Sequence, residues 1–180
     1  MRIVQRHIGL IVLICFIGLT GLIGCNRVKP QGAANRQAAD STAQALMEMN
    51  FLMALEADEL LVDSVQASGL PYVLDQHSFW YLRLDSHEGR EVQDGMRVAY
   101  SATIRDLQSG ALLEERSEEV EVGKRQTLRA IDMCFTEMRE GETFRLLVPF
   151  YNAYGRDGND YVAPLTNVVI VLKVNNITSI

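Results

Sequence analysis

Residues 127–148 read TLRAIDMCFTEMREGETFRLLV, and this stretch decides the predicted fold because its hydrophobic period changes midway. The first part carries apolar residues at helical spacing, namely Leu128, Ile131, Phe135 and Met138. After Gly141, apolar residues instead alternate with polar ones, at Phe144, Leu146 and Val148. This change predicts one short helix that is followed directly by a strand.

The sequence on both sides of this stretch predicts more strands. Residues 79–84 are rich in aromatic residues, and residues 98–104 and 168–174 alternate apolar with polar side chains. Val120 and Val122 suggest one further strand. We therefore expect an α+β domain over residues 77–180, in which a twisted antiparallel sheet of five or six strands wraps on one short helix.

A long helix is predicted ahead of this domain, over residues 40–69. Apolar residues recur there at helical spacing (Leu46, Met49, Met53, Ala57 and Leu60), and Met47, Phe51, Leu55, Val62 and Val65 widen the stripe. So wide a stripe favours packing on the same domain or a homodimer seam over a surface dedicated to client proteins. Residues 25–39, rich in Gln, Ala, Asn and Gly, are expected to form a flexible tether.

The N-terminus has the layout of a secretory signal peptide over residues 1–24. Arg2 and Arg6 precede an apolar run over residues 8–23 that is slightly short for a membrane span, which needs about 20 residues. The run ends in Leu22-Ile23-Gly24-Cys25, which resembles the lipobox of bacterial lipoproteins. This resemblance implies cleavage before Cys25 and a lipid anchor on its thiol. The alternative is an uncleaved anchor followed by an unrelated cysteine.

Composition excludes several classes of function. Cleavage of the signal peptide removes Arg2 and Arg6 and moves the net charge from −6 to −8, so the mature chain is acidic. Because phosphate binding needs concentrated Lys and Arg, we expect no nucleic-acid partner. Cys134 lies in an apolar helical pattern and is expected to pack in the core. His77 and His87 have no cysteine at ligand spacing, so we expect surface positions for them, no metal site and no cofactor.

Several motifs, in order, resemble those of the FKBP-type peptidyl-prolyl cis-trans isomerases. A Gly-x-x-Val lead reaches a tyrosine at residues 95–100, and Leu113-Glu114 follows the glycine turn at Gly110. A strand enters Gly123, and Met-x-x-Gly-Glu occupies residues 138–142. Residues 149–155 read Pro-Phe-Tyr-Asn-Ala-Tyr-Gly, and Ala163-Pro164 follows. Together with the lipobox and the long helix, the chain resembles the lipoproteins of the gliding-motility-associated branch.

The resemblance implies a set of site residues. Tyr154, Tyr100 and Leu128 stand at positions that contact the substrate during catalysis, with the Tyr154 hydroxyl and the Leu128 backbone N–H as donors. The substrate-binding positions are Leu113, Glu114, Ile131, Tyr161, Val162 and Ile170, where Val162 or its neighbour Tyr161 forms a wall. For the tyrosines and branched residues, ordinary barrel packing is the alternative.

Four positions depart from the family pattern. Leu113 replaces a phenylalanine, Glu114 lengthens an aspartate, and Glu118 falls near a position that is usually aromatic. Ile131 replaces the tryptophan that commonly forms the pocket floor. These departures predict weak activity.

The resulting hypothesis is a lipid-anchored prolyl isomerase that assists the folding of proline-containing cell-envelope proteins. The alternative is a non-catalytic FKBP-like chaperone or assembly factor. A cell-envelope location facing the periplasm is expected, with the outer membrane favoured because Asn26 is not the aspartate associated with inner-membrane retention.

Overall fold

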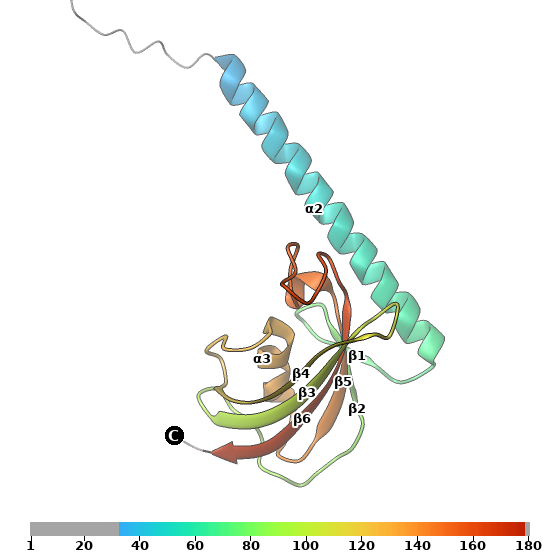
Figure 1. Ribbon diagram of the computed structural model, residues 1–180, viewed down its shortest axis with the longest axis vertical. Coiled ribbons are helices and arrows are strands. Elements are labelled where there is room, and N and C mark those ends of the chain that lie inside the picture. The colour runs from blue at the N-terminus through green and yellow to red at the C-terminus, as the bar shows by residue number, and fades with distance from the viewer. Residues whose placement is uncertain (1–32, 179–180) are drawn as a thin grey trace, which may run out of the picture. The chain divides into compact units, whose positions relative to one another are not determined.

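The computed structural model describes residues 33–178, and their side chains from residue 39 onward (Figure 1). The described part of the chain divides between residues 46 and 47 into two units. The expected signal peptide, Cys25 and the first part of the tether lie outside the described residues.

Six strands form one antiparallel sheet, which confirms the predicted α+β architecture. The strands are β1 (Val73–Leu74), β2 (Trp80–Arg83), β3 (Arg97–Asp106), β4 (Leu112–Glu121), β5 (Thr143–Val148) and β6 (Val168–Thr178). Their order across the sheet is β1-β2-β5-β6-β3-β4. The two-residue strand β1 was not predicted. β4 is much longer than the strand expected at residues 120–122, because most of its residues are polar and hide the alternation.

The long central strands β3 and β6 hold one face of the sheet in the core. Val98, Tyr100, Ala102 and Ile104 are all buried, and in the antiparallel register Tyr100 lies opposite Val174. The alternation that predicted these strands reflects this one-sided burial.

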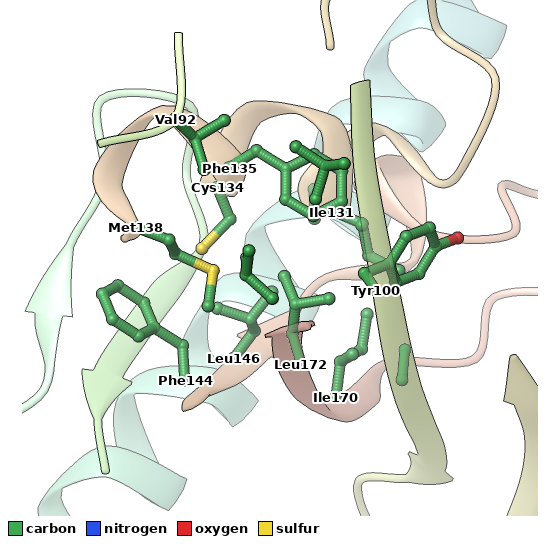
Figure 2. Close-up of a cluster of buried hydrophobic side chains, with 14 of the residues drawn as sticks. Val92, Tyr100, Ile131, Cys134, Phe135, Met138, Phe144, Leu146, Ile170 and Leu172 are labelled. Carbon is green, nitrogen blue, oxygen red and sulfur yellow. The ribbon is translucent and has the colours of Figure 1, made fainter. Parts of the chain in front are cut away.

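The short helix α3 (Arg129–Cys134) lies against this buried face and continues into the 3-10 helix η1 (Phe135–Glu137). Figure 2 shows Ile131, Cys134 and Phe135 beside side chains from the sheet. Cys134 is fully buried, as expected, and burial raises the pKa of its thiol well above the ordinary value. The helical stripe at residues 128–138 is therefore explained by packing of a single apolar face.

The N-terminal helix α2 spans Ala33–Ser68 and ends at Gly69, whose φ of +63° suits a residue without a side chain. It begins before the expected start at Asp40, so the end of the predicted tether at residues 33–39 is helical. The prediction of a flexible tether is wrong for these residues, because alanine and glutamine favour helix. No helix within residues 33–178 is long and apolar enough to cross a membrane.

Within the unit of residues 47–180, one face of α2 packs on the domain. Ala57 and Leu61 are 3% and 1% exposed, and the Tyr151 hydroxyl donates a 2.6 Å hydrogen bond to Asp58. Met47 and Phe51, from the second apolar face, are 71% and 66% exposed. The wide stripe is therefore only partly covered by the chain's own domain.

Candidate functional site

Tyr154 is positioned by a short, strongly hydrogen-bonded segment that follows β5. After Pro149, the 3-10 helix η2 (Phe150–Asn152) turns the chain, and the Phe150 N–H donates to the Asn167 side chain at 2.9 Å. The Gly155 N–H donates to the Phe150 carbonyl at 2.8 Å, and Gly155 has a φ of +75°. A glycine at this left-handed position lets the turn close, which holds the neighbouring Tyr154 in place.

The Tyr154 ring packs against the core, and its hydroxyl reaches β4. The hydroxyl donates a 2.6 Å hydrogen bond to Glu114 Oε2. Arg116 holds the same carboxylate, with Nε 2.7 Å from Oε1 and a second guanidinium nitrogen 3.1 Å from Oε2. Burial, followed by the hydrogen bond to Glu114, raises the pKa of Tyr154 well above its ordinary value. Tyr154 is therefore a neutral donor near neutral pH.

Tyr100 is fully buried on β3, and its hydroxyl also meets β4. It donates to Glu118 Oε2 at 3.1 Å, and because that proton is then used, the Thr127 hydroxyl at 2.7 Å is the donor to Tyr100. The Phe135 ring meets Tyr100 edge-on, with centroids 5.3 Å apart. Burial raises the pKa of Tyr100.

Apolar side chains from three elements share one core cluster with Tyr100, and Tyr154 packs against that cluster. Ile131 from α3 and Ile170 from β6 are fully buried in the same core cluster as Tyr100 (Figure 2), while Leu113 and Leu128 are partly buried against that cluster. Leu128 is the N-cap residue of α3, and its carbonyl accepts from the Asp132 N–H at 3.0 Å. The structure thus brings most of the expected site residues to one cluster.

Two expected wall residues lie outside this cluster. Tyr161 is 84% exposed, and Val162, although 1% exposed, belongs to the loop before β6. Both of their N–H groups donate to the Asn159 side chain, which turns Tyr161 outward. Val162 is therefore the buried member of the pair and Tyr161 the exposed one, and a substrate-binding wall at either position stays a prediction.

Arg116, Thr127 and Phe135 contribute to the site but were not predicted. Arg116 and Thr127 act through hydrogen bonds to Glu114 and Tyr100, and neither stands in a motif. The period of β4 offered one signal, because residues 114, 116, 118 and 120 fall on one face of a strand. Phe135 was visible only as a member of the helical stripe.

The site is chemically simple: an apolar cluster with two tyrosine hydroxyls at its edge. Among the described residues, no group of three or more His, Cys, Asp or Glu side chains is arranged to hold a metal ion. Rotation about an X-Pro bond needs neither nucleophile nor proton abstraction, although its barrier is about 18–20 kcal/mol. An apolar cradle and a donor that favours the twisted amide over the planar one are sufficient to accelerate it.

Comparison with known folds agrees with this geometry. Over 71% of this chain and 95% of the other, the structure is similar to a peptidyl-prolyl cis-trans isomerase from Pseudomonas syringae pv. tomato str. DC3000, at 15% identity and a TM-score of 0.61. Over 81% and 69%, it is similar to FkpA from Escherichia coli, at 14% identity and a TM-score of 0.60. The N-terminal domain of FKBP42 from Arabidopsis thaliana matches 59% of this chain over 91% of its own, at 19% identity and a TM-score of 0.54.

These structural likenesses establish the fold alone, because the identities are low. No curated protein sequence matches the chain significantly. The sequence does match the family model of the FKBP-type peptidyl-prolyl cis-trans isomerases over residues 88–174. This segment holds the predicted motifs, β3 to β5 and most of β6, so the chain carries an FKBP-type peptidyl-prolyl cis-trans isomerase domain.

Proposed function

We propose that this protein is a peptidyl-prolyl cis-trans isomerase that assists the folding of proline-containing proteins of the cell envelope. The observation that carries the proposal is the placement of the Tyr154 hydroxyl, at the edge of an apolar cluster inside a domain of the isomerase family. In this proposal the cluster takes the proline ring and the Tyr154 hydroxyl donates to the substrate backbone. Leu128 supplies the second donor, as the family resemblance implies.

We expect the activity to be weak. Ile131 is fully buried beneath the site and offers less flat surface than the tryptophan common in the family, and the Tyr154 hydroxyl is already engaged by Glu114. Only contacts that improve with the twisted amide accelerate rotation, so a smaller floor lowers kcat. An occupied donor lowers kcat/KM, because fewer molecules are ready to bind substrate.

The same two observations favour the second candidate, a non-catalytic FKBP-like chaperone or assembly factor. Such a protein would bind envelope proteins without accelerating the rotation of their X-Pro bonds. An exchange measurement by NMR on a Leu-Pro peptide separates the candidates, since an isomerase speeds cis-trans exchange in proportion to its concentration. Suppressed aggregation of an unfolding client, with unchanged exchange, would instead support the chaperone.

The proposed location is the cell envelope, with lipid on Cys25 holding the chain to a membrane. The support is the lipobox-like sequence at residues 22–25, and it also underlies the proposed kinship with the gliding-motility-associated lipoproteins. The outer membrane is favoured because Asn26 follows the cysteine. Labelled fatty acid should enter the wild-type chain and not Cys25→Ser. Label in the mutant would overturn the anchor.

We also propose that two copies pair through α2. Met47, Phe51 and Leu55 are 71%, 66% and 44% exposed on the face that the chain's own domain leaves uncovered. Sedimentation of the unlipidated chain should show a dimer that Phe51→Glu dissociates. A monomer at all concentrations would overturn the pairing, and α2 would then only space the domain from its anchor.

A further inference from the structure

One face of β4 presents three charged side chains to the site. From Glu114 onward β4 pairs regularly with β3, so Glu114, Arg116 and Glu118 lie on the same face as Val120, which is 5% exposed. Their neighbour Glu115 points to the opposite face and is exposed. The core-facing side of this edge strand is thus charged next to an apolar cluster.

Each glutamate of this face accepts from one tyrosine of the site. Glu118 accepts from Tyr100, and Glu114 accepts from Tyr154 at 2.6 Å, the shorter of the two contacts. Arg116 lies between them and holds Glu114, with side-chain exposures of 18% and 31% for the two partners. A hydrogen bond between a hydroxyl and a charged carboxylate is roughly twice as strong as a neutral one.

We propose that Glu114 is a gate on the proline site: it holds the Tyr154 hydroxyl in the free protein, and substrate must displace it. The proposal rests on the proposed function, since it assigns Tyr154 as the donor to the substrate backbone. A phenol has a single proton to donate, so Tyr154 cannot serve Glu114 and a substrate carbonyl together. Arg116 reinforces the gate because it keeps the carboxylate ionised and within reach of Tyr154.

The gate acts on binding. When only a fraction of molecules has a free Tyr154 hydroxyl, the apparent affinity for substrate falls by that fraction. A saturating substrate has already displaced Glu114, so the rate at saturation is unaffected. Loosening the gate should therefore lower KM and leave kcat almost unchanged, whereas general damage to the site would lower kcat.

Two variants of the full mature chain loosen the gate in different ways. Glu114→Gln keeps the length and removes the charge, while Glu114→Asp keeps the charge and shortens the side chain by about 1.5 Å, which takes the carboxylate beyond hydrogen-bond distance. The matched control is Glu115→Gln, which makes the same charge change on the opposite face of β4. For both Glu114 variants we expect KM for a Leu-Pro peptide to fall about tenfold, equivalent to about 1.4 kcal/mol.

A spectroscopic readout tests the gate without any turnover. In protein labelled with isotopic tyrosine, the Tyr154 ring signal, assigned with Tyr154→Phe, should titrate at lower pH in Glu114→Gln than in the wild type, because the carboxylate no longer raises the pKa of the phenol. Glu115→Gln should leave that titration and KM unchanged.

The gate is overturned if the Tyr154 titration is the same in wild type and Glu114→Gln, or if KM is unchanged in both Glu114 variants. If no form of the protein accelerates exchange, the proposed function fails. The gate is then tested with the dissociation constant of the same peptide, compared between the wild type and the Glu114 variants. A Tyr154 titration that moves to lower pH together with tighter peptide binding would still support the gate, and unchanged binding would overturn it.

Discussion

At the scale of single residues, Glu114 gives the fold a pH dependence of defined sign. Burial disfavours its charged form, but hydrogen bonds from Arg116 and Tyr154 prevail and lower the pKa of the carboxyl below its ordinary value. Such a group stabilises the fold at pH values above its unfolded-state pKa of about 4.3, and this stabilisation is lost as the pH falls through the folded-state value.

The wild type should therefore exceed Glu114→Gln in free energy of unfolding by the largest margin near neutral pH. The margin should begin to shrink near pH 4, where Glu114 becomes protonated in the unfolded state, and should vanish below the lowered folded-state pKa, where Glu114 is protonated in both states. Urea unfolding across this range measures it. A margin that does not change with pH would mean that the charge of Glu114 does not stabilise the fold.

Ile131 tests whether the pocket floor limits activity. Because Ile131 is fully buried, Ile131→Trp should destabilise the fold by about 1–3 kcal/mol through overpacking. Molecules that remain folded should isomerise a Leu-Pro peptide faster than the wild type, since an indole supplies the flat surface that isoleucine lacks. Denaturant unfolding and NMR exchange measure the two effects. A well-folded mutant with no gain in rate would show that the floor is not limiting.

The sequence predicted which residues gather in one cluster better than it predicted their contacts. Tyr100, Ile131, Ile170 and Tyr154 were placed because motifs fix their positions along the chain, and the structure gathers them. The pairing of Tyr154 with Glu114 and Arg116 could not be predicted, because it joins a loop to an edge strand across the fold. The outward turn of Tyr161 depends on hydrogen bonds to Asn159, which leave no periodic signal.

At the scale of elements, the packing of α2 can be tested with two leucines of the same helix. Leu61 is 1% exposed and Leu52 is 55% exposed. Leu61→Ala should lower the free energy of unfolding by about 2–5 kcal/mol because it opens a cavity where the helix meets the domain. Leu52→Ala, away from that contact, should change it by less than about 0.5 kcal/mol. Equal, small effects would mean that α2 does not contribute to the stability of the domain.

The elements that were predicted well are those buried on one face. β3, β6 and the stripe that became α3 and η1 all carry a clean apolar period, since one side of each lies in the core. β4 is an edge strand rich in glutamate, so its length was underestimated. The start of α2 was placed too late because helix propensity, rather than an apolar stripe, extends it to Ala33.

At the scale of the whole molecule, the site depends on parts that are distant along the chain. Tyr100 comes from β3, Glu114 from β4, Ile131 from α3 and Tyr154 from the segment after β5. No single element contains a working site, so activity requires the folded domain. Tyr154→Phe therefore tests the site with little disturbance of the packing, because it removes the hydroxyl and retains the ring.

The proposed role of Tyr154 as a donor to the substrate is tested by NMR exchange on a Leu-Pro peptide with wild type, Tyr154→Phe and Tyr72→Phe. Tyr72 lies outside the segment that matches the isomerase family and serves as the control. We expect acceleration by the wild type, an equal rate for Tyr72→Phe, and a rate for Tyr154→Phe that is lower by up to about tenfold, the value of one hydrogen bond. Acceleration by Tyr154→Phe equal to that of the wild type, or none by the wild type, would contradict the proposed role.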